Sequence, residues 1–105
     1  MTRSEIRRHI AIHNSPGFRG KTGRVVADLI NYTACQLGRK ERAVTREITS
    51  IVIMDCYGEI VVYVDLNGGD FHGGETVTAH YWQSDLNGGE VQARSSYPSV
   101  RNNKQ

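Results

Sequence analysis

Apolar side chains near the start of the chain recur at the spacing of α-helices. In residues 3–13 they share one helical face, and Thr2 with Glu5 forms the signature of a capping box. In residues 22–37 they recur every three or four positions, and Gly38 follows as a residue that commonly ends helices. The pattern predicts two helices with these bounds.

The rest of the chain alternates apolar and polar positions, as β-strands do. Such segments cover residues 45–54, 59–64, 76–84 and 91–97, and a turn at residues 55–58 joins the first two into a hairpin. Helices followed by strands with short connections favour an α+β fold. We therefore predict two N-terminal helices packed on one face of a four-stranded antiparallel meander sheet.

A length of 105 residues is enough for one modest core and too short for two. We expect a single α+β domain over residues 1–97 and a flexible C-terminal tail over residues 98–105. The longest apolar runs, Ile51–Met54 and Ile60–Val64, are far shorter than the roughly 20 residues of a membrane helix. The N-terminus has no apolar run of the secretory type. We expect a cytoplasmic protein that does not bind membranes.

The two cysteines, Cys35 and Cys56, lack the Cys-x-x-Cys spacing of metal sites. We interpret them as buried thiols rather than as a disulfide framework. The sequence alone leaves their pairing open.

The charged residues are divided unevenly along the chain. Residues 1–46 contain ten Lys and Arg against three acids, and residues 47–105 contain three against eight. The formal charges of the two halves, +7 and −5, combine to the overall +2. Charges on one face act together over about 8 Å at physiological salt, so the first half predicts attraction to an acidic partner.

We expect the cations of this half to bind nucleic acid or an acidic protein surface. The segment Gly20-Lys21-Thr22 opens the second helix and resembles the end of a phosphate-binding loop, but Ser15 stands where the first glycine would be and no strand precedes it. Free amides and an exposed aromatic there suit a phosphate or carboxylate, and an ordinary solvated loop is the alternative. The predicted binding residues are Arg3, Arg7, Arg8, Phe18, Arg19, Lys21, Arg24, Arg39, Lys40 and Arg42.

One hexapeptide pattern occurs twice, at Asp65–Asp70 and at Asp85–Glu90, each directly after a predicted strand. Its Asn-Gly-Gly core supplies the positive φ angles of tight turns, so we expect both copies to reverse the chain. Calcium binding is the alternative, because the side-chain oxygens alternate, although the EF-hand pattern is not met. In a meander, we expect both loops to lie at one end of the sheet and form an acidic rim.

The histidines raise two further hypotheses. His9 and His13 could share a metal, but they lie on the same helical face as Ile6 and Ile10, and we interpret them as half-buried packing residues. The alternative function of the chain is a small metal-dependent hydrolase or calcium-binding module. Its residues would be Asp65, Asp70, His72, Glu75, His80 and Asp85.

The third predicted strand places Tyr81 and Trp82 on opposite faces of the sheet. A large aromatic among short polar side chains is typical of an interface anchor. We therefore expect a second contact face formed by His80, Trp82 and Arg94. The alternative is that the tail or a neighbouring chain covers Trp82, or that both faces of the sheet are buried.

The sequence predicts a small non-catalytic binding or regulatory protein, an adaptor or inhibitor of the kind that phages encode, with no cofactor and no metal. Its partner would be nucleic acid or an acidic surface of a nucleic-acid-handling protein complex. An uncovered final strand over residues 91–97 could also pair with a second copy and form a homodimer.

Overall fold

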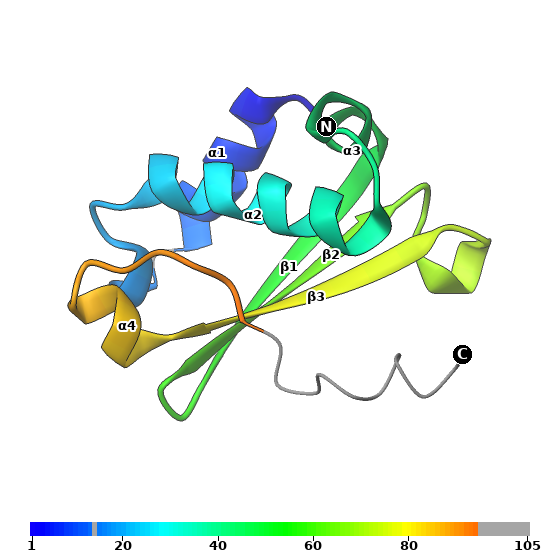
Figure 1. Ribbon diagram of the computed structural model, residues 1–105. Coiled ribbons are helices and arrows are strands. Elements are labelled where there is room, and N and C mark those ends of the chain that lie inside the picture. Colours follow the sequence, from blue (N-terminus) through cyan, green and yellow to red (C-terminus); the bar gives the residue numbers. More distant parts are fainter. Residues whose placement is uncertain (14, 95–105) are drawn as a thin grey trace.

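The computed structural model describes residues 1–13 and 15–94 and has an α+β fold. The elements follow in the order α1 (Arg3–His13), the 3-10 turn η1 (Pro16–Phe18), α2 (Thr22–Leu37), α3 (Glu41–Glu47), β1 (Ile48–Cys56), β2 (Glu59–Leu66), the 3-10 turn η2 (Asp70–His72), β3 (Glu75–Trp82) and α4 (Gln83–Asn87). In Figure 1, α1, α2 and α3 lie on one face of a sheet with the strand order β1-β2-β3. The predicted α+β class and antiparallel sheet are confirmed.

The two helices predicted from the apolar spacing are present with the expected bounds. The backbone N–H of Thr2 donates to Glu5 Oε1 at 2.6 Å, and that of Glu5 donates to Thr2 Oγ1 at 3.2 Å, so the capping box forms. The hydrogen bonds from Thr2 hold the pKa of the Glu5 carboxyl below its ordinary value. The second helix ends at Gly38, whose φ of 66° is a left-handed conformation that suits glycine.

The sheet has one face under the helices and one face without them. On β2, Ile60, Val62 and Val64 are fully buried toward the helices. Tyr63 points to the other side, where the strand register places Val52 of β1 and Thr78 of β3 beside it. We call this second side the open face of the sheet.

The predicted number of strands is wrong, because the described residues form three strands and not four. The hairpin and the third strand are present. Of the predicted fourth strand, residues 91–94 contribute only a single antiparallel bridge, between Arg94 and His80 of β3. Residues 95–97 and the predicted tail at 98–105 lie outside the described residues, so the end of the domain stays a prediction.

The predicted number of helices is also wrong, since α3 and α4 were not expected. Residues 45–47 were assigned to a strand, but they complete α3, in which Thr45 Oγ1 donates to the carbonyl of Glu41 at 2.8 Å. Val44 is fully buried in the same core cluster as the apolar residues of α2. Burial of Val44 outweighs the weak strand preference of β-branched residues.

Residues 83 and 84 were likewise assigned to the third strand, but they begin α4. Leu86 of α4 is buried, and a Cβ placed on Gly17 of η1 would lie 3.2 Å from Leu86 Cδ1. The helix therefore forms because Leu86 reaches the core beside η1. Among the described residues, no helix combines the length and the apolar character that crossing a bilayer would require.

The loop before α2 is anchored in the core through Phe18 and Tyr81. Their rings pack edge to face with centroids 5.7 Å apart. Tyr81 Oη donates to Asp28 Oδ2 at 2.6 Å, and the backbone N–H of Ala93 donates to the same oxygen at 2.9 Å. Burial, with the nearby charge of Asp28, raises the pKa of the Tyr81 phenol above its ordinary value. These contacts fix α2 against β3.

Candidate functional site

Most cations of the described chain have no acidic partner. Of the Lys and Arg within residues 1–13 and 15–94, only Arg39 and Arg94 lie in ion pairs with described residues. The nine others belong to the helical half, and we call them the unpaired cations. They are Arg3, Arg7, Arg8, Arg19, Lys21, Arg24, Lys40, Arg42 and Arg46.

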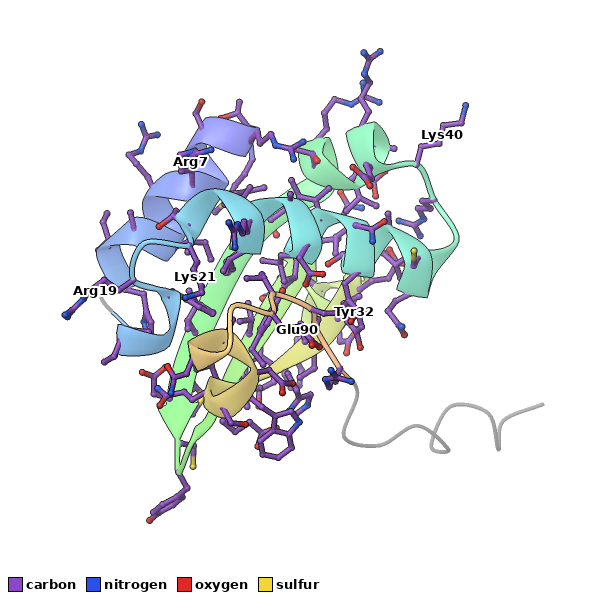
Figure 2. The ribbon with its side chains drawn as sticks, turned by 60° about the vertical axis from the view of Figure 1, so that its left-hand side comes forward. Arg7, Arg19, Lys21, Tyr32, Lys40 and Glu90 are labelled. Carbon is purple, nitrogen blue, oxygen red and sulfur yellow. The ribbon has the colours of Figure 1, made fainter. Side chains whose placement is uncertain are left out.

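Four of the unpaired cations surround the first turn of α2. Arg19 and Lys21 precede it in the chain, Arg24 lies in it, and α1 contributes Arg7. A Cβ placed on Gly23 would lie 3.2 Å from Arg7 Nη2, so the guanidinium of Arg7 rests against this turn. Figure 2 shows Arg7, Arg19 and Lys21 on the same side of the molecule, around the connection between α1 and α2.

The first turn of α2 is the positive end of the helix dipole, and neither a side-chain cap nor an acidic residue in the turn compensates it. Its leading amides have no acceptor within the helix, and no side chain caps them. The turn holds no acidic residue. Arg24 has Asp28 four residues further on, the spacing of an ion pair, but Asp28 is engaged by Tyr81 and Ala93. Helix dipole and cations therefore add at one place.

A hollow lies beside this turn, between the end of α1 and the loop. Ser15, Arg19 and Thr22 line it together with Ile10. The Ser15 side chain is buried, and its Oγ has no hydrogen-bond partner among the described residues. Ser15 stands where a phosphate-binding loop has its first glycine, and it thus places a hydroxyl group in the wall of the hollow.

A second hollow joins the start of α1 to α3. It is lined by Arg3, Arg42 and Arg46, with Glu41 and Met1 between them. The predicted binding residues do not include Arg46, which falls in the segment 45–54 predicted as a strand. The spacing of Arg42 and Arg46, four residues apart after an acidic first residue, was the signal for a short helix with both arginines on one face.

Comparison of the chain with known protein families, with curated proteins and with solved structures found no match. Unpaired guanidinium groups, one lysine and an uncapped helix start are hydrogen-bond donors that suit phosphate or carboxylate oxygens. The chemistry of this arrangement is that of an anion-binding surface.

Four of the predicted binding residues do not join these clusters. Arg8 of α1 lines neither of the two hollows. Lys40 lies at the far end of α2 and points away from the other labelled cations in Figure 2. Arg39 is held by Glu47 and Glu75, with Nη1 2.8 Å from Glu47 Oε1. Phe18 was expected to be exposed, but it is 2% exposed, because its ring packs on Tyr81 in the core.

The second contact face is altered in the structure. Trp82 does lie opposite Tyr81 and is 42% exposed. His80 is buried, in contact with Glu59 through Nδ1, and its backbone pairs with Arg94. Arg94 is bound by Asp85 and Glu90, which raise the pKa of its guanidinium further. The alternation of the strand did not reveal that residues 93 and 94 would cover its edge.

The two hexapeptide loops lie at opposite ends of the sheet, which corrects the prediction of one acidic rim. They follow β2 and β3, which run antiparallel, so the chain leaves the sheet in opposite directions. The first copy makes a turn with positive φ at Asn67, Gly68 and Gly69. The second copy begins inside α4, and Gly88 has a φ of −80°.

The residues proposed for a metal site make other contacts. Asp65 and Asp70 accept hydrogen bonds from Thr76, and Glu75 and Asp85 bind arginines. Among the described residues no group of three or more His, Cys, Asp or Glu is arranged to hold a metal ion. Metal-dependent hydrolysis gains no support from this arrangement.

The interpretation of the remaining histidines and cysteines is partly wrong. His13 is half-buried, as expected, and its Nε2 lies 3.1 Å from Asp55 Oδ1, whereas His9 is exposed. Cys35 and Cys56 are both exposed free thiols and not buried. Helical spacing places His9 at the edge of the apolar stripe, where the neighbouring elements leave it in solvent.

Proposed function

We propose that this chain is a small non-catalytic binding protein that docks its helical surface on the phosphate backbone of nucleic acid. It would act in the cytoplasm as an adaptor or inhibitor of a nucleic-acid-handling complex. The binding surface consists of the four cations around the first turn of α2 together with Arg3, Arg42 and Arg46.

The observation that carries this proposal is the combination of an uncapped helix start with four cations and no acid. Negative side chains stabilise the start of a helix, and positive ones oppose its dipole by about 0.3–1 kcal/mol each at the surface. Here Lys21 and Arg24 occupy that unfavourable place, and Arg7 rests against it. A phosphate group would reverse the cost, because it accepts hydrogen bonds from the free amides and neutralises the cations.

The second hollow extends the same surface. Arg3, Arg42 and Arg46 line it without an ion pair to any described residue. A nucleic-acid backbone presents phosphates at regular spacing, so it engages two groups of cations at once, which a single small anion cannot do.

Fluorescence anisotropy with labelled duplex DNA and single-stranded RNA, over a series of salt concentrations, tests the proposal. The logarithm of the association constant for duplex DNA should fall linearly with the logarithm of salt concentration, with a slope near −0.9 for each phosphate contacted. The variant with Arg7→Gln and Arg24→Gln should bind more weakly, and the slope should become shallower by about two.

The matched control carries Arg8→Gln and Lys40→Gln, which remove the same charge at positions away from the first turn of α2. It should lose less affinity than the first variant. Binding that does not depend on salt, or equal losses in the two variants, contradicts the proposal. Binding of polyglutamate without binding of DNA or RNA would instead identify an acidic protein surface as the partner.

A further inference from the structure

The carboxylates of the sheet half are paired, with two exceptions that lie together. Six of the eight acids between residues 47 and 90 contact an arginine or histidine, namely Glu47, Asp55, Glu59, Glu75, Asp85 and Glu90. The other two are Asp65 and Asp70. Neither has an ion pair with a described residue, and both line one hollow on the open face of the sheet.

The rest of this hollow is largely apolar and unusually exposed. Phe71 is 100% exposed, Val52 and Met54 are about half exposed, and Tyr63 is 37% exposed. Isolated apolar side chains on a surface are ordinary, but a contiguous set of this kind marks an interaction site. Its position on the open face separates it from the unpaired cations of the helical layer.

The two aspartates are held in fixed positions by their neighbours. Thr76 Oγ1 donates to Asp65 Oδ1 at 2.8 Å, and the backbone N–H of Thr76 donates to Asp70 Oδ1 at 3.0 Å. A Cβ placed on Gly69 would lie 2.9 Å from Asp65 Cγ, so the turn packs directly on this carboxylate. Neutral donors fix both groups without neutralising them, which leaves their negative charge for a cation.

We propose that this hollow binds a segment of another protein in which lysine or arginine lies among apolar side chains. The cation would face Asp65 and Asp70, and the apolar side chains would pack on Phe71, Met54 and Val52. Charge complementarity favours this partner, because the described residues that line the hollow include two carboxylates and no Lys or Arg. The same carboxylates repel nucleic acid, so the two surfaces of the molecule select different partners.

Fluorescence anisotropy with a short synthetic peptide, in which lysines alternate with leucine and serine, tests this inference. The intact protein should bind the peptide, and acetylation of the lysines should weaken binding by about tenfold or more. The variant with Asp65→Asn and Asp70→Asn should show a similar loss, because asparagine removes the charge and keeps one oxygen that can accept from Thr76. At Asp65 the amide group then faces Ser50 Oγ, which donates to the second carboxylate oxygen in the wild type. Phe71→Ser should also weaken binding.

The control with Asp85→Asn and Glu90→Gln removes the same charge at the opposite end of the sheet, and its affinity should stay within about twofold of that of the wild type. Circular dichroism confirms that each variant is folded. Equal affinity for the acetylated peptide, equal losses in the two double variants, or no peptide binding at millimolar concentration overturns the inference. So does sedimentation that shows a dimer disrupted by Phe71→Ser, since a second copy would then occupy the hollow.

Discussion

The helical layer and the sheet differ in how far their charged side chains form ion pairs. Around the first turn of α2, Arg7, Lys21 and Arg24 have no acidic partner among the described residues. Beside the sheet, Arg94 pairs with both Asp85 and Glu90. A surface ion pair requires only a nearby opposite charge and contributes at most about 1 kcal/mol. The missing partners in the helical layer therefore cost the fold little stability, and these cations stay available for the anion that we propose they bind.

The two phenylalanines of the chain lie in the same two regions and differ in their exposure to solvent. Phe18 beside the cations is 2% exposed, and Phe71 beside the unpaired aspartates is 100% exposed. Phe18 thus anchors the loop before α2 from within the core. Phe71 is itself available for contact.

The largest expected effect comes from exchanging these two residues for alanine. Phe18→Ala should lower the free energy of unfolding by about 3–5 kcal/mol, because it removes a buried ring and leaves a cavity beside Tyr81. Phe71→Ala should leave the free energy of unfolding unchanged within about 0.5 kcal/mol. Urea denaturation of both variants measures the difference. Equal stabilities would mean that Phe18 is a contact residue, as the sequence suggested.

The turn that positions the unpaired aspartates gives the next effect. Gly68 has a φ of 92°, and a Cβ there would lie 2.9 Å from His72 Cβ, so Gly68→Ala should cost about 1–3 kcal/mol. Gly88 in the second copy has a φ of −80°, and a Cβ placed there would come no closer than 3.5 Å to another residue. Gly88→Ala should therefore be nearly neutral. Thermal unfolding of the two variants compares them directly. A cost at Gly88 as large as that at Gly68 would refute different roles for the two copies.

The smallest effect is also the sharpest test of the charge comparison. Arg24→Glu should raise the free energy of unfolding by about 0.5 kcal/mol, since it places a negative charge at the start of α2. Arg39→Gln should lower it by at most about 1 kcal/mol, because it breaks the exposed pairs with Glu47 and Glu75. Urea denaturation at low salt gives both values. Destabilisation by Arg24→Glu would show that Arg24 serves the fold.

The regular parts of the fold could be predicted because local patterns determine them. The apolar spacing predicts α1 and α2, the capping box marks the start of α1, and Gly38 marks the end of α2. The short helices could not be predicted in this way. The helices α3 and α4 form because Val44 and Leu86 are buried against elements that are distant in the sequence. Neither helix has enough residues for a clear apolar period.

The candidate site could be predicted in composition but not in arrangement. The number of cations and the importance of the loop before α2 could be read from the sequence. It could not show that Arg7 reaches Gly23, that Arg39 is neutralised by Glu75, or that Phe18 is buried, because each depends on contacts between separate segments. The identical hexapeptide core at residues 65–69 and 85–89 makes the same point, since its neighbours select a turn in one copy and a helix in the other.

The most direct test of the central claim is an NMR titration of the ¹⁵N-labelled protein with a short DNA duplex. The account predicts that the largest shifts fall on the backbone amides of residues 19–24 and on those of α1 and α3 near Arg3 and Arg42. The amides of residues 65–72 on the open face should be unaffected, and added salt should reverse the shifts. Shifts centred on the open face, or no shifts at low salt, would contradict the claim that the cations around the first turn of α2, with Arg3, Arg42 and Arg46, form the binding surface.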